Sequence, residues 1–127
     1  MTKKIIFTAK APAPIGPYSQ AVVVRNTLYT SGQIAINPET GDLVIDSIEV
    51  ETKQVMENMK AVLEAAEMSF ENVIKTTIFI MDMNDFSKIN CVYGRYFNEN
   101  SAPARETVQV VGLPKGVNVE ISMVAIK

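Results

Sequence analysis

NVIKTTIFIMDM, residues 72–83, is the stretch that decides the predicted fold. It is rich in β-branched residues and therefore predicts a strand. The segments on either side carry apolar residues at helical spacing instead, which predicts two helices. Asp46 and Glu49 form a capping signal for the first helix, whose apolar stripe consists of Ile48, Val55, Met56, Met59, Val62, Leu63 and Ala66. The second helix is expected over about residues 85–98, with Phe86, Ile89, Tyr93, Tyr96 and Phe97 on one face.

The rest of the chain predicts strands and turns around this centre. Residues 11–20, APAPIGPYSQ, contain three prolines and are expected to form a fixed loop. Residues 21–36 contain two β-rich runs joined near Asn26, which predicts a hairpin. Two more strands are expected at about residues 105–112 and 118–126. The order β-β-β-α-β-α-β-β indicates an α+β fold of one sheet and two helices.

Two helices of this length can cover only one face of such a sheet. The last predicted strand is nevertheless apolar on both faces, because Val119, Ile121 and Met123 alternate with Val124 and Ile126. A second large apolar face is seldom left in water, so we expect a closed homo-oligomer. The alternative is that long loops cover this face.

Composition limits the possible functions. The 127 residues suit a single domain, the net charge is −2, and no basic stripe suggests nucleic-acid binding. No apolar run is long enough for a membrane span or a secretory signal, and the single cysteine, Cys91, suits a cytoplasmic location. The absence of histidine removes the usual general base and the commonest metal ligand. We expect no cofactor and no metal.

A few polar residues interrupt the apolar pattern. Asn90 lies inside the stripe of the second helix and should have a fixed hydrogen-bonding role, either in a cleft or to a neighbouring loop. Glu120 lies within the last strand, where a carboxylate is at an edge, in a cleft, or paired with a cation such as Arg105. Gly32 follows Ser31 in a strand-like run and predicts a bulge or a close backbone approach.

Two of the remaining candidates have opposite expected characters. Cys91 is expected to be a buried, inert thiol. Arg105 has a planar guanidinium group suited to a carboxylate or phosphate, although a structural salt bridge is the commoner use of any single arginine.

Five segments together resemble the RidA (YjgF/YabJ) family. They are IGPYSQA (15–21), YTSGQIAINPETGDL (29–43), KTTIFIMDMNDFSKIN (75–90), PARETVQV (103–110) and LPKGVNVEISMVAI (113–126). The resemblance covers essentially the whole chain as one RidA-like domain, residues 1–127. It implies a chorismate-mutase-like fold, with one mixed sheet of about six strands and two helices on one face. It also implies a homotrimer with clefts between subunits.

The implied activity is that of a 2-iminobutanoate/2-iminopropanoate deaminase. Such enzymes hydrolyse reactive 2-imino or enamine acids to 2-oxo acids and ammonia. By position, the resemblance makes Arg105 the carboxylate clamp and Glu120 the residue that positions the water. It places the remaining site residues along the cleft, with the backbone at Thr107 facing the substrate: Tyr18, Ser31, Gly32, Asn90 and Thr107.

The chain departs from the common family pattern around the arginine. Glu106 follows Arg105 and should point to the opposite face of the strand, and Thr107 stands where a cysteine is frequent, so no covalent step is expected. Ala102 replaces a bulky residue before Pro103 and is expected to widen the pocket.

Two other functions remain open from the sequence. The chain could be a non-catalytic trimeric sensor of 2-oxo acids or related metabolites. A ribonuclease, the third reading, is disfavoured by the net charge and by the absence of histidine.

Overall fold

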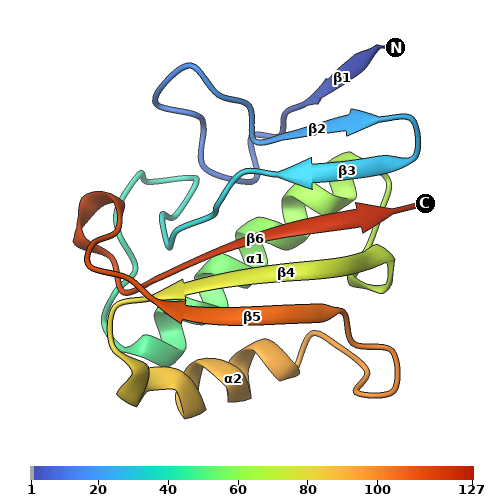
Figure 1. The fold of residues 1–127 in the computed structure, drawn as a ribbon. Coiled ribbons are helices and arrows are strands. Elements are labelled where there is room, and N and C mark those ends of the chain that lie inside the picture. Colours follow the sequence, from blue (N-terminus) through green and yellow to red (C-terminus); the bar gives the residue numbers. More distant parts are fainter. Residues whose placement is uncertain (1) are drawn as a thin grey trace.

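The computed structural model describes residues 2–127 and confirms the predicted order of elements (Figure 1). Over these residues the strands are β1 (Lys3–Ile6), β2 (Ala21–Val24), β3 (Thr27–Thr30), β4 (Val73–Ile80), β5 (Ala104–Gln109) and β6 (Val119–Ile126). The α-helices are α1 (Ile48–Ala65) and α2 (Phe86–Gly94). Single 3₁₀ turns occur at Phe70–Asn72, Met83–Asp85 and Pro114–Gly116. None of the helices in this part of the chain has the length and hydropathy of a membrane span.

The strands form one mixed sheet in the order β1-β2-β3-β6-β4-β5. β4 and β5 run parallel, and the other neighbours are antiparallel. The predicted hairpin is present: β2 and β3 are joined through Arg25 and Asn26, with Arg25 at a φ of 58°. Because β5 is an edge strand, its outer backbone groups have no strand partner.

One face of the sheet carries the hydrophobic core. Ile78 and Ile80 of β4 and Ile121 and Met123 of β6 are buried on this face. The helix α1 packs behind them with Val55, Met56, Met59, Val62 and Leu63, each 0% exposed. The helix α2 packs against α1 near the β5 edge (Figure 1). Both helices therefore cover the same face, as predicted.

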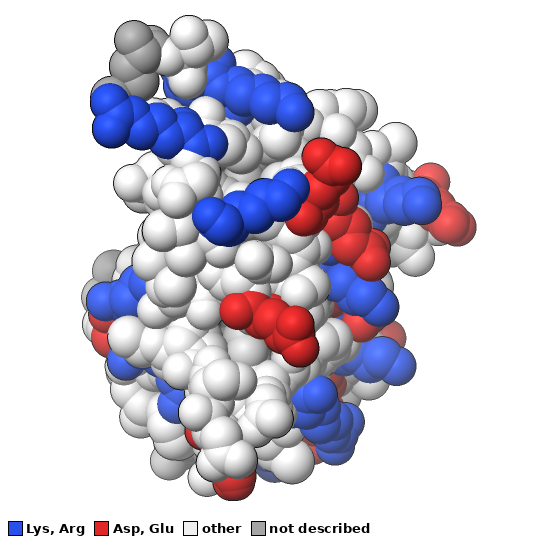
Figure 2. Space-filling view, turned by 90° about the vertical axis from the view of Figure 1, so that its right-hand side faces the viewer, with Lys and Arg blue, Asp and Glu red and all other residues white. Residues whose placement is uncertain are grey.

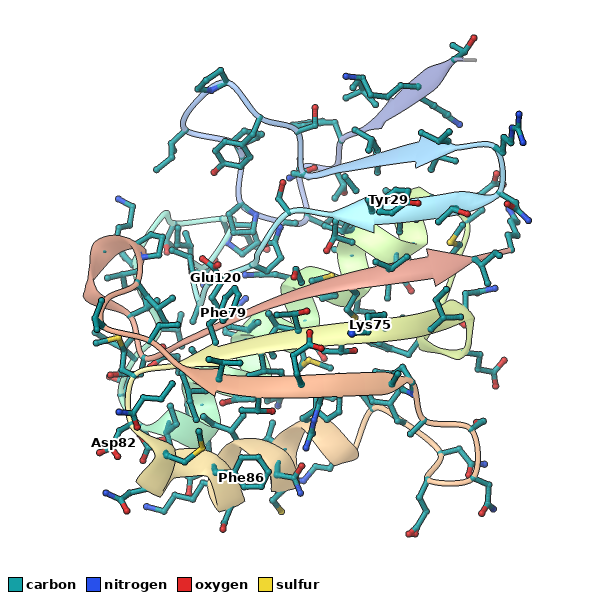
Figure 3. The ribbon with its side chains drawn as sticks, viewed as in Figure 1. Tyr29, Lys75, Phe79, Asp82, Phe86 and Glu120 are labelled. Atoms are coloured by element: carbon teal, nitrogen blue, oxygen red, sulfur yellow. The ribbon has the colours of Figure 1, made fainter. Side chains whose placement is uncertain are left out.

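The opposite face is open in the single chain. Figure 3 shows Tyr29 and Phe79 on the side of the sheet that faces away from α1. Tyr29 is 49% exposed and Val108 of β5 is 42% exposed. Loops do not cover these strands, so an apolar face remains available for contact with another chain.

Glu106 lies on this open face, as expected. Its register partner is Thr77, and it accepts a hydrogen bond from the Thr77 hydroxyl and forms an ion pair of 2.7 Å with Lys75. These contacts lower the pKa of the Glu106 carboxyl, with the Lys75 bond as the larger cause. Arg105 points to the other face, because neighbouring residues on a strand alternate.

Three expectations about the helices need correction. The N-cap of α1 is Ser47 rather than Asp46, and its hydroxyl accepts from the Val50 N–H. The helix α2 ends at Gly94 and is shorter than the pattern suggested. Cys91 is exposed rather than buried, since α2 turns Ile89, Val92 and Tyr93 toward the core and residue 91 away from it.

Candidate functional site

Glu120 lies in a cavity of about 430 Å³ on one side of the molecule. The walls come from the proline-rich loop, the segment after β3 and the turn before β6. The lining residues are Pro12, Ala13, Ile15, Tyr18, Gln20, Ser31, Gly32, Gln33, Ile34, Ile36, Pro114, Lys115 and Glu120. Apolar walls around a few convergent polar groups are typical of small-molecule sites. We call this the Glu120 cavity.

Gly32 lies directly against the Glu120 side chain. A Cβ atom at residue 32 would lie 2.6 Å from Oε2 of Glu120, 2.7 Å from Cδ and 2.9 Å from Cγ. No side chain larger than hydrogen fits there without moving the carboxylate. The predicted close backbone approach is therefore confirmed, and it occurs just after β3 rather than inside a strand.

Glu120 has no cationic partner within residues 2–127, because the ion pairs there are Lys75–Glu106 and Lys127–Glu67. The structural pairing with Arg105 that the sequence left open is absent. Burial raises the pKa of the Glu120 carboxyl above its ordinary value. A carboxylate with a raised pKa beside an open cavity is suited to accept and return a proton.

Ser31 and Tyr18 line the same cavity and already form local hydrogen bonds. The Ser31 hydroxyl donates to the Ser19 carbonyl at 2.5 Å, and the Tyr18 hydroxyl accepts from the Ile15 N–H at 3.4 Å. Ser31 is thus a hydrogen-bonding group, as the sequence predicted, because its hydroxyl hydrogen is already donated to a backbone carbonyl.

Two buried amides that sequence reasoning missed hold the walls of the cavity. Gln20, 2% exposed, accepts from Thr8 N–H and donates to the carbonyls of Thr8, Ala11 and Pro12. Asn58, 1% exposed, donates to the carbonyls of Ile34 and Ile36. A usable signal existed for Asn58, since it is a polar residue within the apolar stripe of α1.

Arg105 lies in a different depression, of about 540 Å³, near α2. The depression is lined by Asn90, Tyr93, Gly94, Phe97, Glu99, Ala102 and Arg105. We call it the Arg105 cavity. The Arg105 guanidinium lies 5.0 Å from the Tyr93 ring centroid and 5.7 Å from that of Phe86, whose place on α2 is marked in Figure 3. Stacking on two rings holds the guanidinium plane in a fixed orientation.

Asn90 provides a fixed contact for this arginine. Its Oδ1 accepts from Nη1 of Arg105 at 2.8 Å. Asn90 is exposed, and the predicted hydrogen-bonding role is present. Among the described residues Arg105 forms no ion pair, so most of its N–H groups remain available for an anion.

Thr107 follows on the same face of β5, two residues after Arg105. Its hydroxyl oxygen is buried and has no hydrogen-bond partner within residues 2–127. Buried polar atoms without partners are rare in native proteins. A hydroxyl without a hydrogen-bond partner, two residues from a guanidinium without an ion pair, indicates a place for a polar ligand.

One chain therefore carries two half-sites on opposite faces of its sheet. Arg105 is in register with the buried Thr76, whereas Glu120 is in register with Phe79 on the open face. Asn90 and Arg105 line the first half-site, with Thr107 on the same face of β5, and Tyr18, Ser31, Gly32 and Glu120 line the second. Within residues 2–127 no group of three His, Cys, Asp or Glu side chains could hold a metal ion.

The fold and the sequence are similar to those of known proteins. The profile of the family described as Ribonuc_L-PSP, endoribonuclease L-PSP, matches residues 8–127. The chain belongs to the RidA (YjgF) family. A human relative, called 2-iminobutanoate/2-iminopropanoate deaminase, is 49% identical over 127 residues, covering 100% of this chain and 92% of that protein.

Solved structures of RidA-family members superpose closely on the chain. A putative endoribonuclease from Thermotoga maritima has a TM-score of 0.96 at 50% identity and covers 99% of this chain and 98% of its own. The TdcF protein of E. coli, solved with bound serine, has a TM-score of 0.92 at 44% identity, with 98% of each chain covered. The predicted fold class is confirmed.

Proposed function

We propose that the protein is a deaminase that hydrolyses reactive 2-imino acids, such as 2-iminobutanoate and 2-iminopropanoate, to 2-oxo acids and ammonia. The observation that carries the proposal is an Arg105 guanidinium without an ion-pair partner among the described residues, two residues before the unpaired Thr107 hydroxyl on the same face of β5. With it goes a half-buried Glu120 that forms no ion pair and lies in an apolar cavity. Human, bovine and mouse relatives, which are 49%, 50% and 48% identical to this chain, bear the name of that activity.

Arg105 is assigned to the substrate carboxylate. A guanidinium group held by Asn90 and by two aromatic rings presents its remaining N–H groups in a fixed plane, which suits a bidentate carboxylate. The free edge of β5 offers backbone groups at Thr107 in addition. That TdcF, a relative, was solved with serine, which also has a carboxylate beside a nitrogen, supports this assignment.

Glu120 is assigned to the water. The protonated imine carbon is already a strong electrophile, so a weakly activated water is sufficient. Glu120 accepts a proton from the water as the new C–O bond forms, and it returns the proton to the nitrogen. The C–N bond then breaks and ammonia leaves, while Glu120 takes the hydroxyl proton as the carbonyl of the 2-oxo acid forms and passes it to the departing ammonia. No histidine and no covalent intermediate are needed.

The two half-sites are proposed to meet between subunits of a homotrimer. They lie on opposite faces of one sheet, so a single chain does not bring them to one substrate. The open apolar face around Phe79 and Val108 supports burial against another copy. Each cleft would then combine Arg105 of one chain with Glu120 of its neighbour.

Subunit mixing tests this proposal. Arg105→Ala should abolish imine hydrolysis in a coupled assay with threonine dehydratase, and Glu120→Gln should reduce it to a small residual rate, while the oligomer stays folded. Mixed oligomers of the two variants should regain about a quarter of the wild-type rate, because a random pairing joins an intact Arg105 to an intact Glu120 at one interface in about four.

The control is each variant unfolded and reassembled alone. If mixed oligomers form, as judged by native mass spectrometry, yet no activity returns, the shared cleft is wrong. If Arg105→Ala keeps full activity, the assignment of Arg105 is wrong as well.

A non-catalytic sensor of 2-oxo acids remains the competing function. Arg105 would serve a sensor equally well, but the half-buried Glu120 carboxylate has no role in binding an anion. Binding of 2-oxobutanoate without acceleration of imine hydrolysis would favour the sensor. The endoribonuclease activity in the family description is not part of the proposal, since the net charge is −2 and the chain has no histidine. On the face drawn in Figure 2, blue side chains gather at one end and mix with red ones below, without a continuous basic track.

A further inference from the structure

Glu51 is unusual because it is an acidic residue inside the core. It lies in the first turn of α1 and is 0% exposed. It is the only charged residue within residues 2–127 that is buried. No lysine or arginine pairs with it in that part of the chain. Burying a carboxylate is costly in free energy unless donors surround it, so Glu51 requires hydrogen-bond donors inside the core.

All three of its partners belong to the two residues immediately before Glu120. Oε2 of Glu51 accepts from the Asn118 N–H at 2.7 Å and from the Val119 N–H at 3.2 Å. Oε1 accepts from the Asn118 side-chain amide at 2.7 Å. A carboxylate only accepts hydrogen bonds and all three partners donate, so the match is complete.

These bonds replace a missing strand neighbour. β3 pairs with β6 only from Val124 to Ile126. Nearer the start of β6, the neighbour on this side is the isolated bridge between Gln33 and Ile121. The N–H groups of Val119 and Ile121 point to the same side, since they are two residues apart. Gln33 accepts from Ile121 at 3.1 Å and Glu51 accepts from Val119.

Glu120 therefore lies between two anchored N–H groups. Residues 115 and 116 just upstream have φ values of 57° and 69°, so the incoming turn has a tight, non-extended backbone. We propose that Glu51 is a positioning residue for the reaction: it holds the start of β6 so that the Glu120 carboxylate stays against Gly32 in the cavity. This inference rests on the proposed role of Glu120.

The alternative is that Glu51 only stabilises the fold. An acidic residue in the first turn favours α1 through the helix dipole. Glu49 lies in the same turn and has no hydrogen bond to β6 among the described residues, so this effect does not depend on β6. A structural role predicts a loss of folded protein, whereas a positioning role predicts a loss of kcat that depends on Glu120.

The test compares Glu51→Ala and Glu51→Gln with wild type, at temperatures where each is folded. For Glu51→Ala we expect kcat to fall about tenfold, less than the roughly 10²-fold that a 1 Å misplacement can cost. KM should change by less than about twofold, because Arg105 still holds the carboxylate. Glu51→Gln should recover most of the activity, since its Oε1 can accept from both backbone N–H groups.

The decisive measurement uses the Glu120→Gln background. If Glu51 acts through Glu120, adding Glu51→Ala should not lower the residual kcat further. Thr52→Val is the matched control, because Thr52 is buried in the same turn but bonds to the Ile48 carbonyl instead of β6. It should reduce stability and leave kcat unchanged. If Glu51→Ala does not fold, Asn118→Ala removes one of the three bonds and should lower kcat in the same direction.

The outcomes separate the two proposals. A folded Glu51→Ala with wild-type kcat, or an equal loss in the Glu120→Gln background, overturns the role of Glu51 and leaves the deaminase intact. A wild type with no imine hydrolysis overturns the deaminase, and the positioning role with it.

Discussion

Gly32 and Glu120 are in close contact in the candidate site. Each residue can be tested by its own substitution. The Glu120 side chain fills the space in front of Gly32, and that space is closed to any Cβ atom. A flexible side chain can move aside at little cost to stability, but a proton-transferring carboxylate cannot move without cost to catalysis.

Gly32→Ala should therefore lose activity selectively. The φ of Gly32 is not in the left-handed region, so alanine is acceptable to the backbone, and the new methyl group displaces the Glu120 carboxylate. We expect kcat to fall by about 10² with a shift in Tm of no more than about 2 °C. Gly112→Ala, where nothing lies within 4 Å of the new atom, is the control and should behave as wild type. Retained kcat in Gly32→Ala would count against the contact.

Glu120 should also show a pH-dependent stability difference. Because burial raises its pKa, the folded chain favours the protonated form, and that stabilisation is lost as pH rises through the folded pKa. Glu120→Gln should thus raise Tm at pH 7 and have little effect below the ordinary glutamate pKa of about 4.3. Thermal melts in the Arg105→Ala background remove any guanidinium near Glu120 whose charge would lower its pKa and so oppose the effect of burial. An equal gain at both pH values would contradict the burial argument.

At the scale of single elements, the start of α1 is the clearest case. The Ser47 hydroxyl caps the helix, while Asp46 precedes the cap and has no such bond among the described residues. The first turn also contains Glu51, which accepts hydrogen bonds from the start of β6. The helix cap and this contact with β6 therefore lie at the same end of α1.

Ser47→Ala should therefore lower the free energy of unfolding by about 1 kcal/mol, the usual value for a lost N-cap. Asp46→Ala is the matched control and should change it by less than about 0.5 kcal/mol. Denaturant titration of the two variants measures both. A larger effect at Asp46 than at Ser47 would show that the cap lies one residue earlier.

At the scale of the whole molecule, the open sheet face links assembly to activity. Phe79 lies on this face and is in register with Glu120, so any subunit packed there lies close to the Glu120 cavity. The proposed shared cleft requires that contact. A monomer would retain both half-sites and still lack a complete site.

Phe79→Lys should produce folded monomers without imine hydrolysis, because in the proposed trimer it would bring three added charges to one subunit interface, where they repel one another. Light scattering after gel filtration measures the mass, and circular dichroism reports the fold. Ile45→Lys, at a 43% exposed residue in the segment before α1, should remain oligomeric and active. An active Phe79→Lys monomer would place the whole site in one chain.

The sequence alone determined the order of elements, the hairpin at Asn26, the single helix-covered face and the family, because these depend on local periodicity and on motifs. It also predicted that Glu106 would turn away from Arg105, since strand side chains alternate. Boundaries and individual exposures were less reliable: α2 ends at Gly94, and Cys91 proved exposed because α2 turns Ile89, Val92 and Tyr93 toward the core instead.

Only the tertiary structure decided which polar residues share a cavity. Register in a sheet is a long-range property, so no local pattern could reveal that Arg105 and Glu120 lie on opposite faces of one chain. The same holds for Glu51, whose three donors lie 67 and 68 residues away. A buried carboxylate is stable only where the fold brings donors to it, and that arrangement exists only once helix and strand have packed.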